Sequence, residues 1–184
     1  MGKNFVVTSY TQRTADVYPY DTSYKPIANV PIVSAATAYD DPNTGDTWLL
    51  IINEGLFYGN KLDHTLLNPN QIRHYQIDYW DNPYDKHHDL SIVVPGVLTI
   101  PLFQIGTKLQ FQTCSPTARE LLDIPDDYRT GLTSASEWNP DSVQLSSIHT
   151  QDEAIPFMQR LQTGTLYMQT LPVMKHYYIQ YIHI

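Results

Sequence analysis

The apolar residues in the first two thirds of the chain fall into short runs that are separated by turn residues. Residues 5–10, 15–20 and 28–38 are rich in β-branched and aromatic side chains and are broken by proline or polar residues, as edge strands and barrel strands are. Residues 48–53 form a continuous apolar run of strand length, which predicts a central strand buried on both faces. The chain is therefore predicted to begin as a β-structure.

A turn is predicted between residues 28–38 and 48–53. Asp41, Pro42 and Gly45 lie between these two strands. Proline presets φ and glycine tolerates a positive φ, so the flanking strands should pair as a hairpin.

Three further strands are predicted before the composition of the chain changes. They cover residues 90–94, 97–103 and 108–112, and Pro95 and Gly96 supply the turn between the first two. In the last strand apolar and polar residues alternate, which indicates burial on one face only. Together with the four earlier runs and a short apolar stretch over residues 56–58, this makes roughly eight strands.

A short helix is predicted to begin in the tract LLNPNQIRHY. Asn68 is placed as the N-cap and Pro69 as the first helical residue, and Gln71 stands where the partner of a capping box is expected. Leu67 and Ile72 have the spacing of a hydrophobic staple. The helix should run for about two turns before extended and turn residues resume.

The composition changes after the last of these strands. Thr117 and Glu120 form a second predicted capping box, so residues 114–150 are interpreted as a short helix followed by a wrapping arm. Residues 152–161 are compatible with a helix that an internal proline restricts. In residues 173–184 apolar and polar residues alternate, which predicts a terminal strand.

Composition and charge narrow the class of protein. A content of 42% hydrophobic and 16% charged residues, with 14 Tyr and 13 Pro, suits a strand-rich and loop-rich globular protein. The formal net charge is -8 and the basic residues do not cluster, which disfavours a nucleic-acid partner for this surface. No window approaches about 18 consecutive apolar residues, so no membrane insertion is expected.

Cys114 is the only cysteine of the chain. An internal disulfide and a Cys-based zinc site are therefore excluded, and a reducing compartment fits. The N-terminal residues lack the apolar core of a signal peptide, so an intracellular location is favoured, with no indication of the organelle. No local signature marks Cys114 as a nucleophile, and the usual state of such a lone thiol is burial.

No metal site and no cofactor site are predicted. His87 and His88 are adjacent and would face opposite ways on an extended segment, as would His176 and His183 on a strand. There is no HExxH or His-x-His pattern, and the glycines form no nucleotide-binding motif. Ordinary surface or hydrogen-bonded roles are predicted for all seven histidines, which are His64, His74, His87, His88, His149, His176 and His183.

No catalytic residue is predicted either. Asp21, Thr22 and Ser23 compare with the Asp-Thr/Ser-Gly motif of aspartic proteases, but serine replaces the glycine and no apolar strand precedes it, so an Asx or ST turn is predicted. Turn or cap roles are likewise predicted for the adjacent acids Asp40 and Asp41, Asp126 and Asp127, and Asp152 and Glu153. The nucleophile elbow G-x-S-x-G is absent, and no substrate-binding residue is assigned.

The tyrosines have two interpretations. They could line a groove for a peptide or a sugar, because tyrosine supplies rigid contact area with a polar tip. The more common arrangement, and the one favoured here, places them in the core and at the rim of a β-barrel.

The order of these elements resembles the protease region of Ty1/copia-type retrotransposon polyproteins over about residues 2–140. The tracts that carry the resemblance are VPIVSAATAYDDPNTGDTWLLIINEGLFYGNKLDHTLLNPNQIRHYQIDYWDNPYD, IPLFQIGTKLQFQTCSPTARELLDIP and LTSASEWNP. The resemblance implies a mainly β fold, namely a small closed retropepsin-like β-barrel over residues 1–113 with one or two short helices. It leaves residues 114–184 as a helix and loop arm with a terminal strand, packing on the barrel or on a partner.

In this family the catalytic Asp motif lies just upstream of the glycine that Gly2 resembles, so the resemblance implies that no residue of this chain inherits the catalytic role. Retropepsins build their carboxyl dyad by homodimerisation. We therefore expect a non-catalytic structural or binding subunit, paired with itself or held in a larger protein assembly by strand addition at exposed edges. Two alternatives stay open: a fragment of an active retrotransposon aspartic protease whose Asp motif lies upstream, and a tyrosine-rich peptide or carbohydrate binding module.

Overall fold

The computed structural model describes residues 1–19, 21, 23–140 and 182–183. It divides the chain into two units, of which one comprises Met1–Trp138 with Ile179–Ile184 and the other Asn139–Tyr178. The fold described below is that of the first unit. The predicted helix over residues 152–161 and most of the predicted terminal strand lie outside the described residues.

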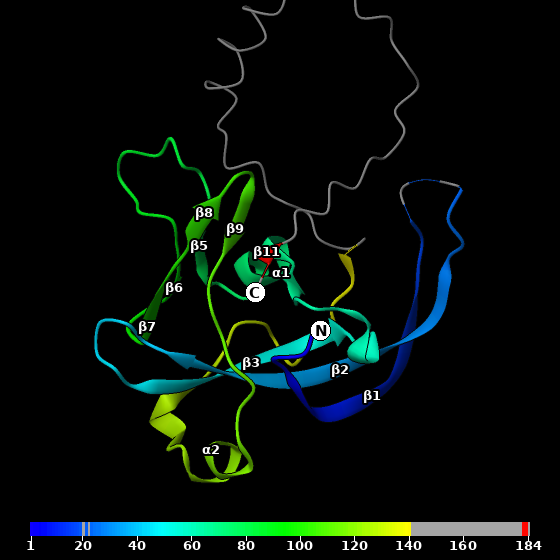
Figure 1. Cartoon of the computed structure of the whole chain (residues 1–184), viewed down its shortest axis with the longest axis horizontal. Coiled ribbons are helices and arrows are strands. Elements are labelled where there is room, and N and C mark those ends of the chain that lie inside the picture. Colours follow the sequence, from blue (N-terminus) through cyan, green and yellow to red (C-terminus); the bar gives the residue numbers. More distant parts are fainter. Residues whose placement is uncertain (20, 22, 141–181, 184) are drawn as a thin grey trace, which may run out of the picture. The chain divides into compact units, whose positions relative to one another are not determined.

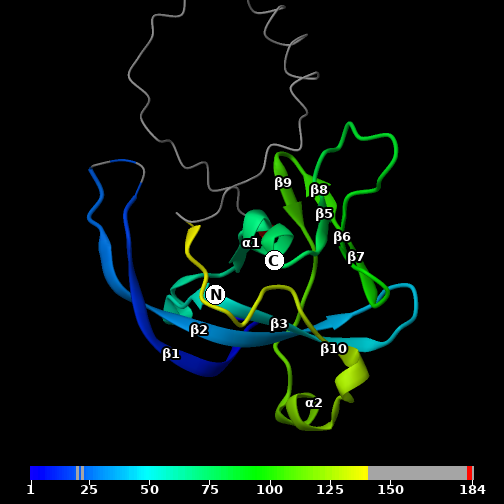
Figure 2. The same ribbon diagram turned by 180° about the vertical axis from the view of Figure 1, so that it is seen from behind.

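The first sheet contains the longest strands of the described part of the chain. Its strands are β1 (Val6–Val17), β2 (Ile27–Asp40), β3 (Thr47–Leu56) and β10 (Arg129–Gly131), in the order β1-β2-β3-β10. The first three form an antiparallel meander, and β10 pairs in parallel with β3 (Figures 1 and 2). The apolar run predicted as a central strand is therefore confirmed, because β3 has a neighbour on each side.

The first two runs predicted as separate strands are one strand, β1. Its register with β2 shifts between Tyr10 and Thr14, where the chain bulges. The hydroxyl of Thr11 donates to the carbonyl of Ile32 at 2.9 Å and accepts from the backbone N–H of Arg13 at 3.1 Å. The polar residues that looked like a break in the sequence therefore lie in an irregularity inside a continuous strand.

The turn predicted between β2 and β3 is confirmed. The backbone N–H of Asp41 donates to the carbonyl of Asp46 at 2.8 Å, and a carboxylate oxygen of Asp41 accepts from the N–H of Asn43 at 2.9 Å. Gly45 adopts a φ of +78°, which glycine tolerates without strain. Asp41 is thus a turn acid, as predicted. Asp40 is instead the last residue of β2, where it pairs with Thr47 and its carboxylate accepts from the Thr47 hydroxyl.

Seven short strands form two further sheets in the described residues. The second sheet has the order β4-β11-β9-β8, with β4 (Leu66–Leu67), β11 (Ile182–His183), β9 (Lys108–Gln110) and β8 (Phe103–Ile105). The third sheet has the order β5-β6-β7, with β5 (Asp78–Trp80), β6 (Ser91–Val94) and β7 (Leu98–Pro101). The predicted turn at Pro95 and Gly96 joins β6 to β7, and Gly96 has a φ of +71°.

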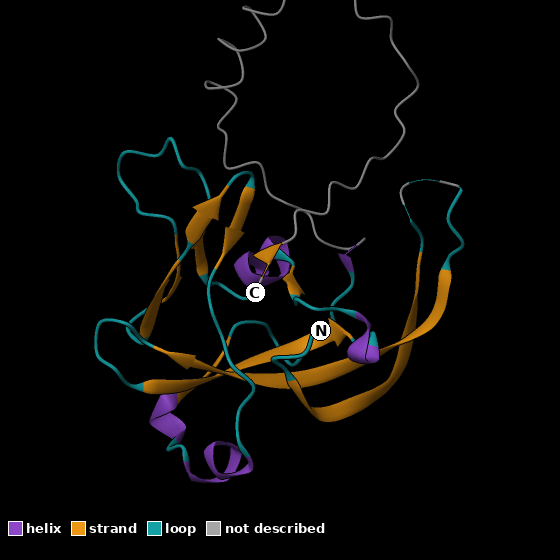
Figure 3. Cartoon of the chain, in the orientation of Figure 1, coloured by secondary structure: helices purple, strands orange, loops and turns teal. Residues whose placement is uncertain are grey.

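The predicted strand over residues 97–103 proves to be two strands in different sheets. β7 ends at Pro101, the backbone N–H of Leu102 donates to the carbonyl of Leu90 at 2.8 Å, and β8 then starts in the second sheet. The mainly β class is confirmed, as Figure 3 shows by its predominance of strands. The described strands form three sheets, however, and no closed barrel is detected among them.

Helix α1 (Pro69–His74) begins where the sequence predicts, at the N-cap Asn68. The side chain of Asn68 accepts from the backbone N–H of Asn70, but the predicted capping box is wrong, because the side-chain amide of Gln71 donates to the carbonyl of Asn53 on β3 at 3.2 Å. The helix start is therefore tied to the first sheet by the residue that was expected to cap it.

The remaining helical segments are short. The capping box predicted for Thr117 and Glu120 is confirmed at the start of α2 (Ala118–Asp123). Two 3-10 helices, η1 (Gly59–Lys61) and η2 (Asp126–Tyr128), complete the described helices. Asp126 and Asp127 lie in the first turn of η2, which agrees with their prediction as cap acids.

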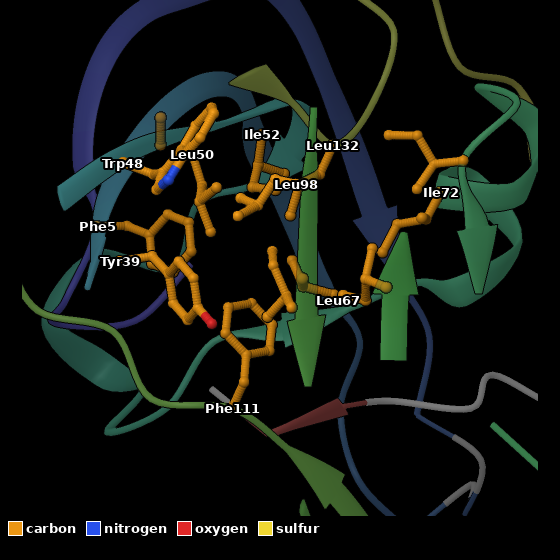
Figure 4. Packing of buried hydrophobic residues seen from close by; sticks show 14 of the residues in the cluster. Phe5, Tyr39, Trp48, Leu50, Ile52, Leu67, Ile72, Leu98, Phe111 and Leu132 are labelled. Atoms are coloured by element: carbon orange, nitrogen blue, oxygen red, sulfur yellow. The ribbon is translucent and has the colours of Figure 1, made fainter. Parts of the chain in front are cut away.

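One hydrophobic core joins the sheets of this unit. Figure 4 shows Leu50 and Ile52 of β3 beside Leu98 of β7, so the first and third sheets share the core. Leu67 and Ile72, the residues of the predicted staple, are both in the same buried cluster. The aromatic members of the cluster are Phe5, Tyr39, Trp48, Tyr79 and Phe111.

Candidate functional site

Asp21 and Ser23 take part in a turn, as predicted. The carboxylate of Asp21 accepts from the backbone N–H of Ser23 at 2.8 Å, and the carbonyl of Asp21 accepts from the N–H of Tyr24. The hydrogen bonds from Ser23 hold the pKa of the Asp21 carboxyl below its usual value. Thr22 lies outside the described residues.

The histidines of the described residues make ordinary contacts. His88 stacks on Trp80 with ring centroids 3.6 Å apart, and its Nδ1 lies 2.8 Å from a carboxylate oxygen of Asp85. The other oxygen of Asp85 accepts from the backbone N–H of His87, and these two bonds lower the pKa of Asp85. Over the described ranges no group of three or more His, Cys, Asp or Glu residues could hold a metal ion.

Cys114 is exposed, so the expectation of a buried thiol is wrong. The residue forms an isolated bridge with Ala38, which leaves its side chain at the surface next to the first sheet. Partial desolvation and the nearby carboxylates of Asp40 and Glu120 raise the pKa of the thiol. A raised pKa lowers the thiolate fraction, so this environment does not activate Cys114 as a nucleophile.

A pocket of about 330 Å³ lies between α1 and the segment that follows β10. We call it the α1 pocket. Its volume is at the lower end of the range of roughly 300 to 1,000 Å³ that is usual for ligand sites. The residues that line it are Gln71, His74, Tyr75, Gln76, Ser134, Ser136, Glu137 and Trp138.

The end of β3 holds both walls of the α1 pocket. On the helix side, the Gln71 amide donates to the carbonyls of Asn53 and Glu54 at 3.2 and 3.5 Å. On the opposite side, the backbone N–H and side-chain amide of Asn53 donate to the hydroxyl and carbonyl of Thr133, and the Thr133 hydroxyl donates to the Asn53 carbonyl. Since one strand end fixes both walls, the pocket is pre-formed.

Glu54 is held in a constrained conformation beside the pocket. It has a φ of +56°, a conformation that costs a residue with a side chain about 1 kcal/mol or more. Its side chain is 5% exposed, and its carboxylate accepts from the Arg13 guanidinium and, at 3.0 Å, from the backbone N–H of Trp138. Arg13 also lies 3.5 Å from Glu137, so this network connects β1 to the pocket wall.

Three aromatic side chains contribute to the lining of the pocket. The rings of His74 and Trp138 meet edge to face with centroids 5.2 Å apart. Tyr75, the C-cap of α1, is partly exposed, and its ring lies next to Gly131 at the end of β10. The pocket therefore combines aromatic faces with a carboxylate, hydroxyls and amides.

The β1–β2 hairpin extends beyond β3. Ile32 is the first residue of β2 to pair with β3, so residues 27–30 of β2 have only β1 as a partner among the described strands. Tyr18 and Tyr24, near the far end of the hairpin, are 73% and 68% exposed. β1 is also an edge strand in the described sheet, with unpaired backbone groups along its outer side.

Comparisons of the chain with protein-family models, with curated proteins and with solved structures find no match in any of the three. The site must therefore be interpreted from its own geometry. In the described part of the chain each helix is too short to span a membrane.

Sequence reasoning did not identify the residues that organise the α1 pocket. Asn53 and Glu54 end the apolar run of β3 and look like ordinary strand-end polar residues. The only signal in the sequence is that the polar pair Asn53 and Glu54 follows a continuous apolar run and directly precedes Gly55. Gln71 has the spacing of a capping-box residue, and Trp138 lies in the tract LTSASEWNP, for which the resemblance implies no role.

The first two residues of the chain are buried. The Met1 ammonium donates to the carbonyl of Leu56 at 2.8 Å, and the Met1 side chain belongs to the hydrophobic core. The backbone N–H of Gly2 donates to the Thr65 hydroxyl at 2.6 Å. Desolvation lowers the pKa of the Met1 amine from 8.0 to about 6.

This burial predicts a pH-dependent stability. Between pH 6 and 8 the unfolded chain binds the amine proton more strongly than the folded chain, so the free energy of unfolding should rise with pH in this window. The full pKa difference is equivalent to at most about 2.7 kcal/mol, and about 1 to 2 kcal/mol remains for an amine with partial access to solvent. Urea unfolding of protein that retains Met1, checked by mass spectrometry, measures the change.

The control is the same protein with an acetylated N-terminus, which has no titrating amine. All other groups are the same in the two forms, so the prediction concerns the difference between their two pH profiles. Parallel profiles would contradict the assigned environment of Met1.

Proposed function

We propose that this chain is a retropepsin-like, mainly β domain that acts without catalysis, as a subunit that binds extended peptide segments of a protein partner. The observation that carries the proposal is the pre-formed α1 pocket joined by Arg13 to an exposed edge strand. An edge strand supplies main-chain hydrogen bonds for an added strand, and an adjacent pocket supplies side-chain specificity.

The retropepsin-like assignment rests on the sequence resemblance over about residues 2–140 and is supported by the mainly β fold. The order of elements also supports it. Helix α1 follows Leu66 and Leu67 of β4 after one residue, and the resemblance implies a short helix directly after an apolar pair. In the proposed subunit the β1–β2 hairpin takes part in contacts with a second copy or with a larger assembly. Its exposed tyrosines favour such a role because they supply contact area at low entropic cost.

A second candidate is an active aspartic protease in which an Asp motif precedes Gly2. The buried amine of Met1 favours it, because a charged ammonium is costly at a desolvated position. An uncharged peptide N–H at the same place would satisfy the carbonyl of Leu56 without that cost.

Replacing both Tyr18 and Tyr24 by serine should weaken self-association or partner binding by about tenfold or more, if the hairpin supplies the contact. Sedimentation equilibrium measures self-association, and titration with immobilised extended peptides measures binding. The matched control is Tyr84→Ser, because Tyr84 is 88% exposed but lies in the loop between β5 and β6. An equal loss of binding in this control would contradict a specific role of the hairpin.

A fluorogenic peptide assay at about pH 4 to 6, where a carboxyl dyad shares one proton, distinguishes the two candidates when it is run both on these residues and on a longer product that includes any residues encoded in frame before Met1. The proposed subunit shows no turnover that pepstatin inhibits. Pepstatin-sensitive turnover by these 184 residues would overturn the proposal. Binding of oligosaccharides in place of peptides would instead indicate a carbohydrate-binding module.

A further inference from the structure

We infer that the α1 pocket binds a cationic side chain, arginine or lysine, of the peptide partner. This inference rests on the proposed peptide-binding function and specifies the chemistry of its partner. The lining residues and their charges carry it.

The charges around the pocket favour a cation over an anion. Glu137 contributes a carboxylate whose side chain is 68% exposed, and neither lysine nor arginine lines the pocket. The nearest cation in the network, Arg13, already contacts two carboxylates, those of Glu54 and Glu137. These three groups together carry one negative charge, and the lining offers an anionic ligand no lysine or arginine to pair with.

The aromatic lining favours the same ligand. The face of an aromatic ring carries negative potential and attracts ammonium and guanidinium groups, with tryptophan the best partner. Two contacts hold Trp138 in place. Its backbone N–H donates a hydrogen bond to the buried Glu54 carboxylate, and its ring packs edge to face against the ring of His74. The phenol ring of Tyr75 adds a second aromatic face to the lining. The rings are therefore positioned before the ligand arrives, which reduces the entropic cost of binding.

The remaining lining groups can accept hydrogen bonds from a cation. Ser134 and Ser136 offer hydroxyl oxygens, and Gln76 offers an amide oxygen. The planar guanidinium of arginine stacks on aromatic rings and is more weakly hydrated than the ammonium of lysine, so arginine should be preferred. The net charge of -8 adds long-range attraction for a basic peptide.

The test uses short peptides that differ at a single central residue. The probes are acetylated and amidated Ser-Val-Xaa-Val-Ser peptides in which Xaa is arginine, lysine, citrulline or phosphoserine. Citrulline keeps the shape of arginine but has no charge. Titrations followed by NMR or by tryptophan fluorescence should give an arginine to citrulline affinity ratio of about 3 to 30, as expected for a cation on an aromatic face.

Two variants locate the effect in the pocket. Glu137→Gln and Trp138→Leu should each bring the ratio close to one, and the exposed position of the Glu137 carboxylate leaves folding unchanged in the first. The control is Asp127→Asn, which removes one negative charge at an exposed residue outside the lining and should keep the ratio.

The outcomes separate this inference from the function on which it rests. If all the peptides bind alike, or if the ratio persists in Glu137→Gln, the cation site is overturned while peptide binding stands. Tighter binding of the phosphoserine peptide would also overturn it. If none of the peptides binds and the hairpin variants leave self-association unchanged, the proposed function fails as well.

Discussion

Replacing Leu50 by alanine is expected to lower the free energy of unfolding by about 2 to 5 kcal/mol. Leu50 has no exposed surface and lies on β3, the strand on which both walls of the α1 pocket depend. Removing its branched end leaves a cavity among side chains of the first and third sheets, as Figure 4 indicates. Since domains of this size are stabilised by only about 5 to 15 kcal/mol, the loss is a large share of the total.

Urea unfolding followed by tryptophan fluorescence measures the effect, with an unchanged slope against denaturant showing that the two-state behaviour is retained. The matched control is Leu122→Ala, because Leu122 is 80% exposed on α2. Its effect should stay within about 0.5 kcal/mol, as for most surface substitutions. A Leu50→Ala loss no larger than that of Leu122→Ala would contradict the described core.

The features that follow from local chemistry were predictable from the sequence. The turn at Asp41 and Gly45, the turn at Gly96 and the capping box at Thr117 all appear in the structure. Each of them is determined by hydrogen bonds or φ values within about four residues, so the residue types alone carry the information.

The assignment of strands to sheets was less predictable. The run over residues 97–103 reads as one strand, but β7 and β8 lie in different sheets because Leu102 pairs with Leu90 between them. The bulge in β1 likewise depends on Thr11, whose hydroxyl bonds across to β2. Such outcomes depend on partners distant in sequence, which periodicity does not report.

The candidate site shows the same limit. Gln71 has the spacing of a capping-box residue, and its competing partner is the backbone of Asn53, eighteen residues away in sequence. Glu54 becomes informative only through its positive φ and the two groups that reach its carboxylate. A pocket that is organised by a strand end and two distant segments has no local signature, so only the folded arrangement identifies it.

Replacing Gly2 by alanine is the second substitution with a large expected effect. A Cβ at this position would lie 2.6 Å from the carbonyl carbon of His64 and 2.9 Å from the backbone nitrogen of Thr65. These contacts are with backbone atoms, which cannot move aside as a flexible side chain can. The cost should be about 1 to 3 kcal/mol, typical of overpacking, and it should release Met1 from the core.

The release of Met1 gives this prediction a second readout. Once the amine is in water its pKa returns toward the ordinary value, so the rise in stability between pH 6 and 8 should disappear together with the lost stability. Lys3→Ala is the control, because the Lys3 and Asp63 side chains of its ion pair are 59% and 77% exposed and such pairs contribute little. If Gly2→Ala kept both its stability and its pH dependence, the close approach of the chain start to residues 64–65 would be wrong.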